Sequence, residues 1–250
     1  MKRVLILGGT GDAAALAAKA AQIPNVEIIT SLAGRTQNPT AIAGSVRVGG
    51  FGGASGLRNY LRDRQITCLI DATHPFAAQI SHNAAIATRD IGIPHLMLVR
   101  PAWEEQSGDR WIEVESVEAA ALALEQTAKR VFLTIGRQQL APFARLHNVW
   151  FLMRSIDPPL PDITLPNGIT VLDRAPFTIA QEKQLMLDHT IDTIVSKNSG
   201  GNATYAKIVA ARELEIPIVM VQRSPTPQVE QVANVESAID WLLGYVDDVR

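Results

Sequence analysis

Short runs of successive apolar residues alternate along the chain with longer segments in which apolar residues recur every three or four positions. Runs such as Val4–Leu7 are typical of parallel strands that are covered on both faces. Segments such as Ala77–Ile91 place their apolar residues on one helical stripe. The repeated alternation of strand and helix predicts an α/β fold built on doubly wound parallel sheets.

The predicted elements cover most of the chain, and Ser116 is expected to cap the helix that follows it. The predicted strands are Val4–Leu7, Val26–Thr30, Cys68–Ile70, Leu96–Val99, Val131–Leu133, Val149–Met153, Thr170–Leu172, Thr193–Val195 and Ile218–Val221. The predicted helices are Asp12–Gln22, Gly56–Arg64, Ala77–Ile91, Val117–Thr127, Gln138–Leu146, Ile179–Asp188, Ala203–Glu213 and Val235–Leu243.

The periodicity is interrupted between Arg100 and Asp109, where Pro101 and Gly108 stand in a polar stretch. We therefore expect two domains of similar architecture, residues 1–104 and residues 105–250. The segment Asp157–Gly168 contains four prolines, so we expect it to be a surface loop within the second domain.

Composition narrows the class of protein. The chain has 23 basic and 25 acidic residues and a formal net charge of −2, so no basic excess indicates a nucleic-acid partner. The single cysteine, Cys68, suits a reducing compartment, and no pair of histidines has metal-ligand spacing, so we expect no bound metal. No apolar run approaches the roughly 20 residues that span a membrane, and the apolar run after Met1 is too short for a signal peptide. We expect a globular cytoplasmic protein.

The first candidate for chemistry is the glycine turn after the first predicted strand. Glycine at the first and fourth positions of this turn permits a tight bend and a close approach of a pyrophosphate, and the helix that follows presents its N-terminal N–H groups. The alternative is a strand-to-helix turn that binds no ligand. The residues assigned to the dinucleotide phosphates are Gly8, Gly9, Thr10, Gly11 and Asp12.

The end of the second predicted strand indicates which dinucleotide is bound. NAD-binding proteins usually carry a carboxylate there, whereas this strand ends in Thr30 and Ser31 and is followed by Arg35 and Thr36. A guanidinium is well suited to bind a phosphate. We therefore predict NADPH, with Ser31 and Arg35 on the 2′-phosphate and Thr36 beside them. The alternative is that Arg35 is a solvated loop cation.

Two further loops of the first domain precede predicted helices. Gly49–Gly53 surrounds Phe51 with four glycines, which favours a loop that a ligand can approach closely, although a flexible connector has the same composition. Asp71–Phe76 places polar groups at a strand end, and His74 is the histidine best suited to proton transfer. From these loops, Gly50, Phe51 and Thr73 are assigned to the cofactor.

The second half has two turns of similar character. Leu133–Arg137 ends a strand in a glycine and a cation, and Val195–Gly201 combines Lys197 with hydroxyl and backbone N–H donors. Both turns suit an anion. Capping of the next helix by Asn198 or Ser199 is the structural alternative, and it is compatible with ligand binding.

The motifs together resemble the precorrin-6A reductase family of corrin biosynthesis, which has a metal-free and a cobalt-substrate branch. One position differs from the family, which usually shows Glu-Ala-Arg where this chain has Asp12-Ala13-Ala14. The resemblance covers nearly the whole chain and rests on Gly8–Asp12, Ser31–Thr36, Gly49–Gly53, Asp71–Ala77, Arg100–Trp103, Leu133–Arg137, Ser196–Gly201 and Lys207.

The resemblance implies an NADPH-dependent reductase with two Rossmann-like doubly wound domains and an active site in the cleft between them. It implies hydride transfer to a macrocycle double bond of the tetrapyrrole precorrin-6A, or of its cobalt complex, which gives the 6B product. On this hypothesis the catalytic candidates are His74, Asp71 and Lys197. The substrate-binding candidates are Phe76, Arg100, Arg137, Ser196, Asn198, Ser199 and Gly200.

Two other interpretations compete with this one. A reductase or epimerase of small carbonyl compounds commonly has a Tyr-x-x-x-Lys pair, but none of Tyr60, Tyr205 and Tyr245 has a lysine four residues later. A non-catalytic NADP-sensing module would retain the first glycine turn without needing His74 or Lys197. The sequence leaves open the oligomeric state, the metal status of the substrate, the face that receives the hydride, and the proton donor, which is His74, Asp71 or water.

Overall fold

The computed structural model describes residues 1–34, 42–159 and 161–247. The chain divides into two compact units, one formed by Met1–Pro101 with Pro225–Arg250 and the other by Ala102–Ser224. Each unit contains one six-stranded sheet in which every pairing is parallel. The α/β class and the doubly wound parallel sheets expected from the sequence are confirmed.

The sheet of the first unit has the strand order β3-β2-β1-β4-β5-β12. From β1, the strands β2 and β3 follow on one side and β4 and β5 on the other, and β12 adds beyond β5, which is the order of Rossmann folds. The strands are β1 (Lys2–Leu7), β2 (Val26–Leu32), β3 (Ser45–Val48), β4 (Cys68–Asp71), β5 (His95–Leu98) and β12 (Glu230–Val232).

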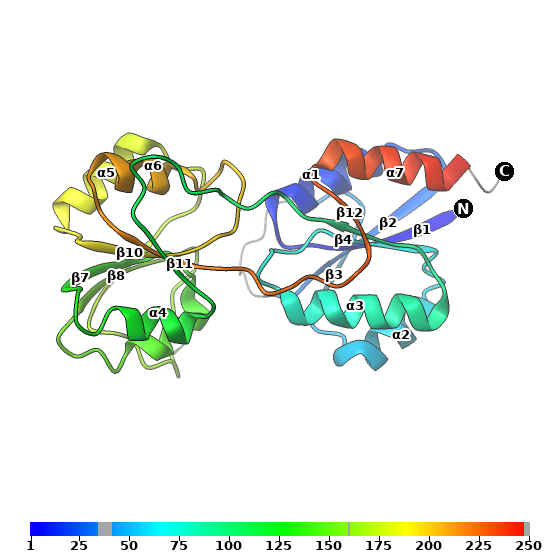
Figure 1. Cartoon of the computed structure of the whole chain (residues 1–250). Coiled ribbons are helices and arrows are strands. Elements are labelled where there is room, and N and C mark those ends of the chain that lie inside the picture. The colour runs from blue at the N-terminus through cyan, green and yellow to red at the C-terminus, as the bar shows by residue number, and fades with distance from the viewer. Residues whose placement is uncertain (35–41, 160, 248–250) are drawn as a thin grey trace. The chain divides into compact units, whose positions relative to one another are not determined.

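Helices cover both faces of this sheet (Figure 1). On one face α1 (Gly11–Ala20) packs beside α7 (Val235–Asp247), and on the other α2 (Gly53–Asp63) packs beside α3 (Ala78–Ile91). This arrangement explains why the central strands are apolar on successive residues, because both of their faces are covered.

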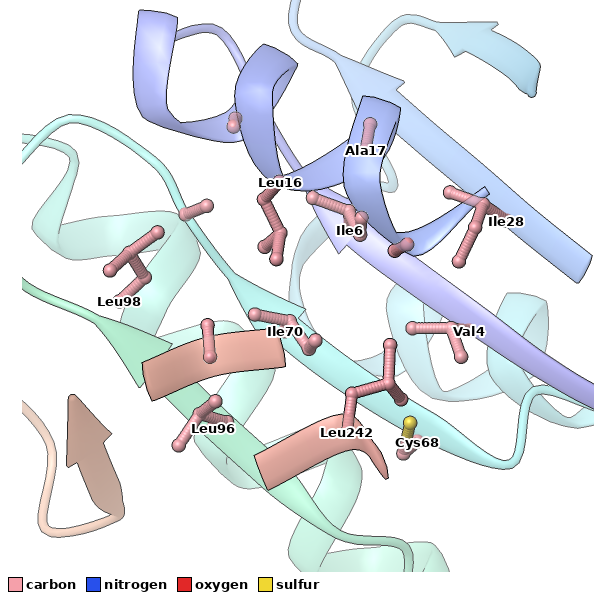
Figure 2. Packing of buried hydrophobic residues seen from close by; sticks show 14 residues of the cluster. Val4, Ile6, Leu16, Ala17, Ile28, Cys68, Ile70, Leu96, Leu98 and Leu242 are labelled. Atoms are coloured by element: carbon pink, nitrogen blue, oxygen red, sulfur yellow. The ribbon is translucent and has the colours of Figure 1, made fainter. Parts of the chain in front are cut away.

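The core under α1 and α7 shows how residues far apart in the sequence are joined (Figure 2). Leu16 of α1 and Leu242 of α7 are both fully buried and pack with Ile6 and Ile70 of the sheet. Cys68 lies in the same cluster, and burial raises the pKa of its thiol to about 12. The cysteine is therefore an apolar core residue rather than a nucleophile.

The second unit repeats this order as β9-β8-β7-β10-β11-β6. On one face of its sheet α5 and α6 pack against each other, and α4 lies on the other face (Figure 1). The strands are β6 (Trp111–Val114), β7 (Arg130–Leu133), β8 (Trp150–Ser155), β9 (Gly168–Leu172), β10 (Thr193–Lys197) and β11 (Ile218–Val221). The helices are α4 (Val117–Ala123), η1 (Arg137–Gln139), η2 (Ala141–Phe143), α5 (Ile179–Asp188) and α6 (Ala206–Glu213).

The sheet of the second unit is built from one continuous run of chain, β6 to β11, whereas the sheet of the first unit takes its sixth strand, β12, from the chain beyond the second unit. The chain leaves β5 and forms β6, which pairs with β11, and it leaves β11 and forms β12, which pairs with β5. The division therefore differs from the expected domains 1–104 and 105–250, since residues from Pro225 onward belong to the first unit. Polar edge strands of three or four residues carry little hydrophobic periodicity. The return of the chain to the first sheet as β12 was therefore not predicted.

Most other predicted elements lie where the sequence pattern placed them. Ser116 caps α4 as expected, because its side chain accepts a hydrogen bond from the Ala119 N–H (3.0 Å). The helix predicted over Gln138–Leu146 is wrong, since this segment forms only η1 and η2 with a proline at the start of η2. The sequence pattern also missed the edge strands β3, β6 and β12.

Within the described residues, no helix is long and apolar enough to cross a membrane. Across the same ranges, no group of three or more His, Cys, Asp or Glu side chains is placed to hold a metal ion.

Candidate active site

The turn between β1 and α1 is held by main-chain and hydroxyl hydrogen bonds. The Gly8 N–H donates to the Ser31 carbonyl oxygen (2.9 Å). The Thr10 hydroxyl accepts from the Ala13 N–H (3.0 Å) as the N-cap of α1 and donates to the Ala72 carbonyl oxygen (2.8 Å). Thr10 therefore ties the glycine turn to the loop that follows β4.

The glycines of this turn leave open space in front of α1. A side chain at Gly8 would approach the Thr30 methyl group to 3.0 Å, so this glycine permits close packing on β2. In the part of the chain that the structure describes, a Cβ atom at Gly9 or at Gly11 would meet no atom within 4 Å beyond the adjoining backbone, and Gly9 has a φ of +109°. Space beside the N–H groups of a helix N-terminus fits a pyrophosphate.

The end of β2 is occupied by an arginine that the sequence analysis did not single out. Arg47 of β3 is the register partner of Ser31, and its Nη1 donates to the Ser31 hydroxyl oxygen (3.2 Å). The same guanidinium donates to the carbonyl oxygens of Gly49 (2.5 Å) and Gly50 (2.6 Å). Arg35 and Thr36, the predicted partners of a 2′-phosphate, lie outside the described residues.

The loop Gly49–Gly53 folds tightly around the Arg47 guanidinium. The guanidinium carbon lies 3.8 Å from the centroid of the Phe51 ring, and Phe51 packs edge-on against Tyr60 of α2. A Cβ at Gly56 would lie 1.7 Å from the Phe51 carbonyl oxygen, so only glycine fits there. The loop is thus a defined structure rather than a flexible connector, although the predicted role of Phe51 as a platform for a ligand is not tested by these contacts.

The loop after β4 is organised by Asp71, which is 1% exposed. Its Oδ1 accepts hydrogen bonds from the Thr73 N–H (3.0 Å) and the Thr73 hydroxyl (2.7 Å). Its Oδ2 is buried and has no hydrogen-bond partner among the described residues. Asp71 therefore fixes Thr73 and the turn that leads to His74.

His74 has a defined orientation in this turn. Its Nδ1 accepts a hydrogen bond from the Phe76 N–H (3.2 Å), and the two rings lie 5.8 Å apart between centroids. Because Nδ1 accepts, the neutral imidazole carries its proton on Nε2. His74 and Phe76, assigned from the sequence to catalysis and to substrate, thus occupy one small turn.

A second histidine lies behind this loop. His95 of β5 is buried, and its Nδ1 lies 3.3 Å from the Thr88 hydroxyl oxygen. Burial lowers the pKa of the His95 imidazole, and the Asp71 carboxylate opposes that shift in part. The imidazole is therefore neutral near pH 7 and forms part of the core.

Two residues assigned to different ligands are paired with each other. Arg100 was expected to bind substrate and Asp12 to bind cofactor, but Arg100 Nη1 lies 2.8 Å from Asp12 Oδ2. This ion pair joins the first turn of α1 to the segment that leaves the first unit.

In the second unit, Lys197 and Thr134 connect two strand ends. Lys197 Nζ donates to the Ile135 carbonyl oxygen (3.1 Å), and the Thr134 hydroxyl donates to the Val195 carbonyl oxygen (3.0 Å). Arg137 donates to the Pro158 carbonyl oxygen (2.6 Å) and lies 3.8 Å from Asp157. Both predicted anion-binding cations therefore connect their own loop to a neighbouring loop of the second unit.

The loop after β10 is filled by its own side chains. Asn198 is 3% exposed, and its side chain accepts from the Trp103 N–H (2.8 Å) and donates to the Trp103 carbonyl oxygen (3.0 Å). Ser196 and Ser199 are buried as well, as is Gly200, which has a φ of +66°. The Trp103 indole N–H also binds this loop, by donating to the Gly201 carbonyl oxygen (2.9 Å).

A buried lysine lies behind this loop. Lys207 of α6 is 3% exposed, donates to the Thr204 carbonyl oxygen (2.9 Å) and lies 4.7 Å from the centroid of the Trp103 ring. Burial, and to a smaller extent the Arg154 charge, lower its pKa to about 7, while Glu182 opposes the shift. Lys207, one of the residues on which the family resemblance rests, is therefore a side chain enclosed by the protein.

Comparison with known proteins decides the family. A model of the family described as precorrin-6x reductase CbiJ/CobK matches residues 3–243. The chain belongs to the precorrin-6x reductase CbiJ/CobK family. The CbiJ/CobK family consists of reductases, so the chain is an oxidoreductase.

Individual relatives of the CbiJ/CobK family agree over nearly the whole chain. The precorrin-6A reductase of Rhodococcus erythropolis is 49% identical over 97% of this chain and 98% of its own length. A solved structure of a CobK precorrin-6A reductase is 40% identical, with a TM-score of 0.91 and coverage of 98% of this chain and 97% of that chain. The cobalt-precorrin-6A reductase of Methanothermobacter thermautotrophicus is 26% identical over 98% of this chain and 85% of its own length.

Proposed function

We propose that this reductase transfers a hydride from NADPH to a macrocycle double bond of precorrin-6A and so produces the 6B compound of cobalamin biosynthesis. Reductase chemistry is a property of its family. The observation that carries the cofactor proposal is the open space beside Gly9 and Gly11 at the N-terminus of α1. This space lies at the carboxyl end of β1, where Rossmann folds bind dinucleotides.

The residues of the first unit fit a dinucleotide. The turn Gly8–Gly11 would hold the pyrophosphate through its backbone N–H groups, while Ser31 stands at the ribose end. Thr73 would contact the cofactor from the end of β4, where Asp71 fixes its hydroxyl. When bound, the reduced nicotinamide supplies the hydride.

The residues after β4 are proposed to handle the proton. The Phe76 N–H donates to His74 Nδ1 and so orients the ring. His74 would deliver the proton as an imidazolium, which the transfer leaves as a neutral imidazole. Asp71 acts through Thr73 and the turn, since its carboxylate is buried.

The second unit is proposed to bind the acidic side chains of the macrocycle. Lys197 and Arg137 stand at adjacent strand ends. Lys197 donates to the Ile135 carbonyl oxygen, and Arg137 donates to the Pro158 carbonyl oxygen and forms an ion pair with Asp157. Asn198, Ser196 and Ser199 shape the loop that carries Lys197. Arg100 is half-buried beside Asp12 in the first unit.

We assign the metal-free form of the substrate to this chain. The supporting observation is the contrast between 49% identity to a relative named for precorrin-6A and 26% identity to a relative named for the cobalt compound. We place the reaction in the cytoplasm, in keeping with one buried free cysteine.

The test is an absorbance assay of purified protein with NADPH and either metal-free or cobalt-containing precorrin-6A. We expect oxidation of NADPH with the metal-free substrate and slower oxidation with the cobalt form. Oxidation that requires NADH instead, or no change in either substrate, would contradict the proposal.

The role of His74 is tested separately. His74→Ala should lower kcat about 10²-fold with saturating NADPH, the lower end of the usual contribution of a positioned proton donor. Affinity for NADPH should stay unchanged. His82→Ala is the matched control, since His82 is an exposed histidine of α3. A wild-type kcat in His74→Ala would remove His74 from proton transfer.

A further inference from the structure

The guanidinium of Arg47 lies where a dinucleotide places its adenosine ribose. β2 and β3 are parallel neighbours, and Ser31 and Arg47 are paired in register near their carboxyl ends. In Rossmann folds the end of the strand equivalent to β2 contacts the ribose hydroxyls. This strand ends Thr30-Ser31-Leu32, with no carboxylate to accept them.

Arg47 is held in a fixed orientation. Its two terminal nitrogens donate to the carbonyl oxygens of Gly49 (2.5 Å) and Gly50 (2.6 Å), and Nη1 also donates to the Ser31 hydroxyl oxygen (3.2 Å). The guanidinium carbon lies 3.8 Å from the Phe51 centroid and 5.1 Å from the Tyr60 centroid. A side chain fixed on two rings and two carbonyl groups loses little conformational entropy when a ligand binds.

The charge of Arg47 is not balanced by the protein around it. Among the residues that the structure describes, no carboxylate lies within ion-pair distance of this guanidinium, and the groups it contacts are carbonyl, hydroxyl and aromatic. The loop beside it is approachable, because Cβ atoms at Gly50 and Gly52 would meet no further atom of residues 1–34, 42–159 and 161–247 within 4 Å. A partly buried cation beside open backbone favours a small, strongly charged anion.

We infer that Arg47 determines the preference of this reductase for a 2′-phosphorylated adenosine, by binding the 2′-phosphate together with the Ser31 hydroxyl. This inference rests on the proposed use of NADPH. It differs from the assignment of that phosphate to Arg35, because Arg47 is fixed by the glycine loop and links recognition of the phosphate to the conformation of Gly49–Gly53.

The experiment measures binding of NADPH, NADH, adenosine 2′,5′-bisphosphate and adenosine 5′-monophosphate to the full chain by calorimetry. Arg47→Ala should weaken the binding of NADPH and of the bisphosphate by about 10- to 100-fold, which is the usual contribution of a hydrogen-bonded ion pair to a phosphate. Binding of NADH and the monophosphate should change less than about 3-fold, within the context-dependence of a neutral contact.

Two further variants make the result specific. Arg47→Lys keeps the charge but loses the forked geometry, so it should give an intermediate preference for the 2′-phosphate. Arg62→Ala removes an exposed cation from α2 and should leave all four affinities unchanged, which controls for net charge. Circular dichroism and melting temperature establish that each variant is folded.

The outcomes separate this inference from the proposed function. Equal losses of NADPH and NADH affinity in Arg47→Ala, or no loss in either, would overturn the role of Arg47 while leaving the dinucleotide site intact. Failure of the wild-type chain to bind any nicotinamide nucleotide would overturn the proposed function together with the inference.

Discussion

The turn after β1 and the loop after β10 both follow a buried parallel strand and both are rich in glycine and hydroxyl residues, yet they are built in opposite ways. Among the described residues, no atom outside the adjoining backbone lies within 4 Å of the position that a Cβ would take at Gly9 or Gly11. Around Asn198 the side-chain amide is engaged by both main-chain groups of Trp103. The backbone of one loop is open, whereas the side chains of the other hold the protein together.

This difference separates two kinds of sequence motif. A glycine that permits the approach of a ligand contributes to binding and little to stability, so its replacement should alter affinity alone. A buried polar side chain that satisfies main-chain groups contributes to stability, because losing it leaves those groups without partners. The following substitutions test that separation.

The largest expected effect is at Gly11, the first residue of α1. Gly11→Val should fold normally, because the position is open and its φ is not positive. The branched side chain should block the pyrophosphate and weaken the binding of NADPH about 100-fold, equivalent to about 2.7 kcal/mol of binding free energy. Calorimetry measures the affinity, and thermal melting should show no loss of stability. A variant that binds NADPH as the wild type does would contradict the proposed phosphate site.

The second effect is expected at Asn198. Asn198→Ala should lower the free energy of unfolding by about 1–3 kcal/mol, because it leaves the Trp103 N–H and carbonyl groups buried without partners. Affinity for NADPH should be unchanged. Urea denaturation and calorimetry measure the two quantities. If stability were unchanged while substrate affinity fell, Asn198 would be a ligand-binding residue instead.

The third effect is a dependence of stability on pH that comes from Lys207. The folded pKa of about 7 lies below the unfolded value of 10.5, so between these values the unfolded chain binds a proton that the folded chain does not. Stability therefore rises with pH above about 7, by at most about 1.4 kcal/mol per pH unit from this group. Below about pH 7 that gain is absent and the cost of burying the charge is present in full.

Lys207→Met removes the titrating group and keeps an unbranched side chain of similar length. The difference in unfolding free energy between wild type and variant should therefore change in favour of the wild type from pH 7 to pH 9. The groups that face Lys207, Arg154 of β8 and Glu182 of α5, remain paired with each other in both proteins. Parallel stability curves over this range would show that Lys207 keeps its proton when buried.

The sequence predicted the open turn better than the filled loop, for a physical reason. Gly8 and Gly11 are informative because a glycine in such a turn lets other groups approach the backbone closely. The strand before them and the helix after them are also strongly periodic. Ser and Asn donors serve a ligand or a main-chain partner equally well. The partner of Asn198 is Trp103, 95 residues away, and no local pattern marks that contact.

The lack of a local sequence pattern also explains why the role of Arg47 and the strand β12 were not predicted. Arg47 lies on an exposed edge strand, where Val46 and Val48 are solvent-accessible and the apolar pattern is weak. The one available signal in the sequence was its place two residues before the loop Gly49–Gly53. β12 has three residues and joins a strand more than 130 residues earlier in the chain, so only tertiary structure reveals it.

The central claim, that the nicotinamide of NADPH supplies the hydride for precorrin-6A, is tested most directly by isotope transfer. The purified chain is incubated with metal-free precorrin-6A and NADPH that carries deuterium at both positions of nicotinamide C4, and the product is analysed by mass spectrometry. The account predicts a reduced macrocycle that retains a single carbon-bound deuterium. A reduced product without deuterium, or unchanged precorrin-6A beside intact NADPH, would contradict it.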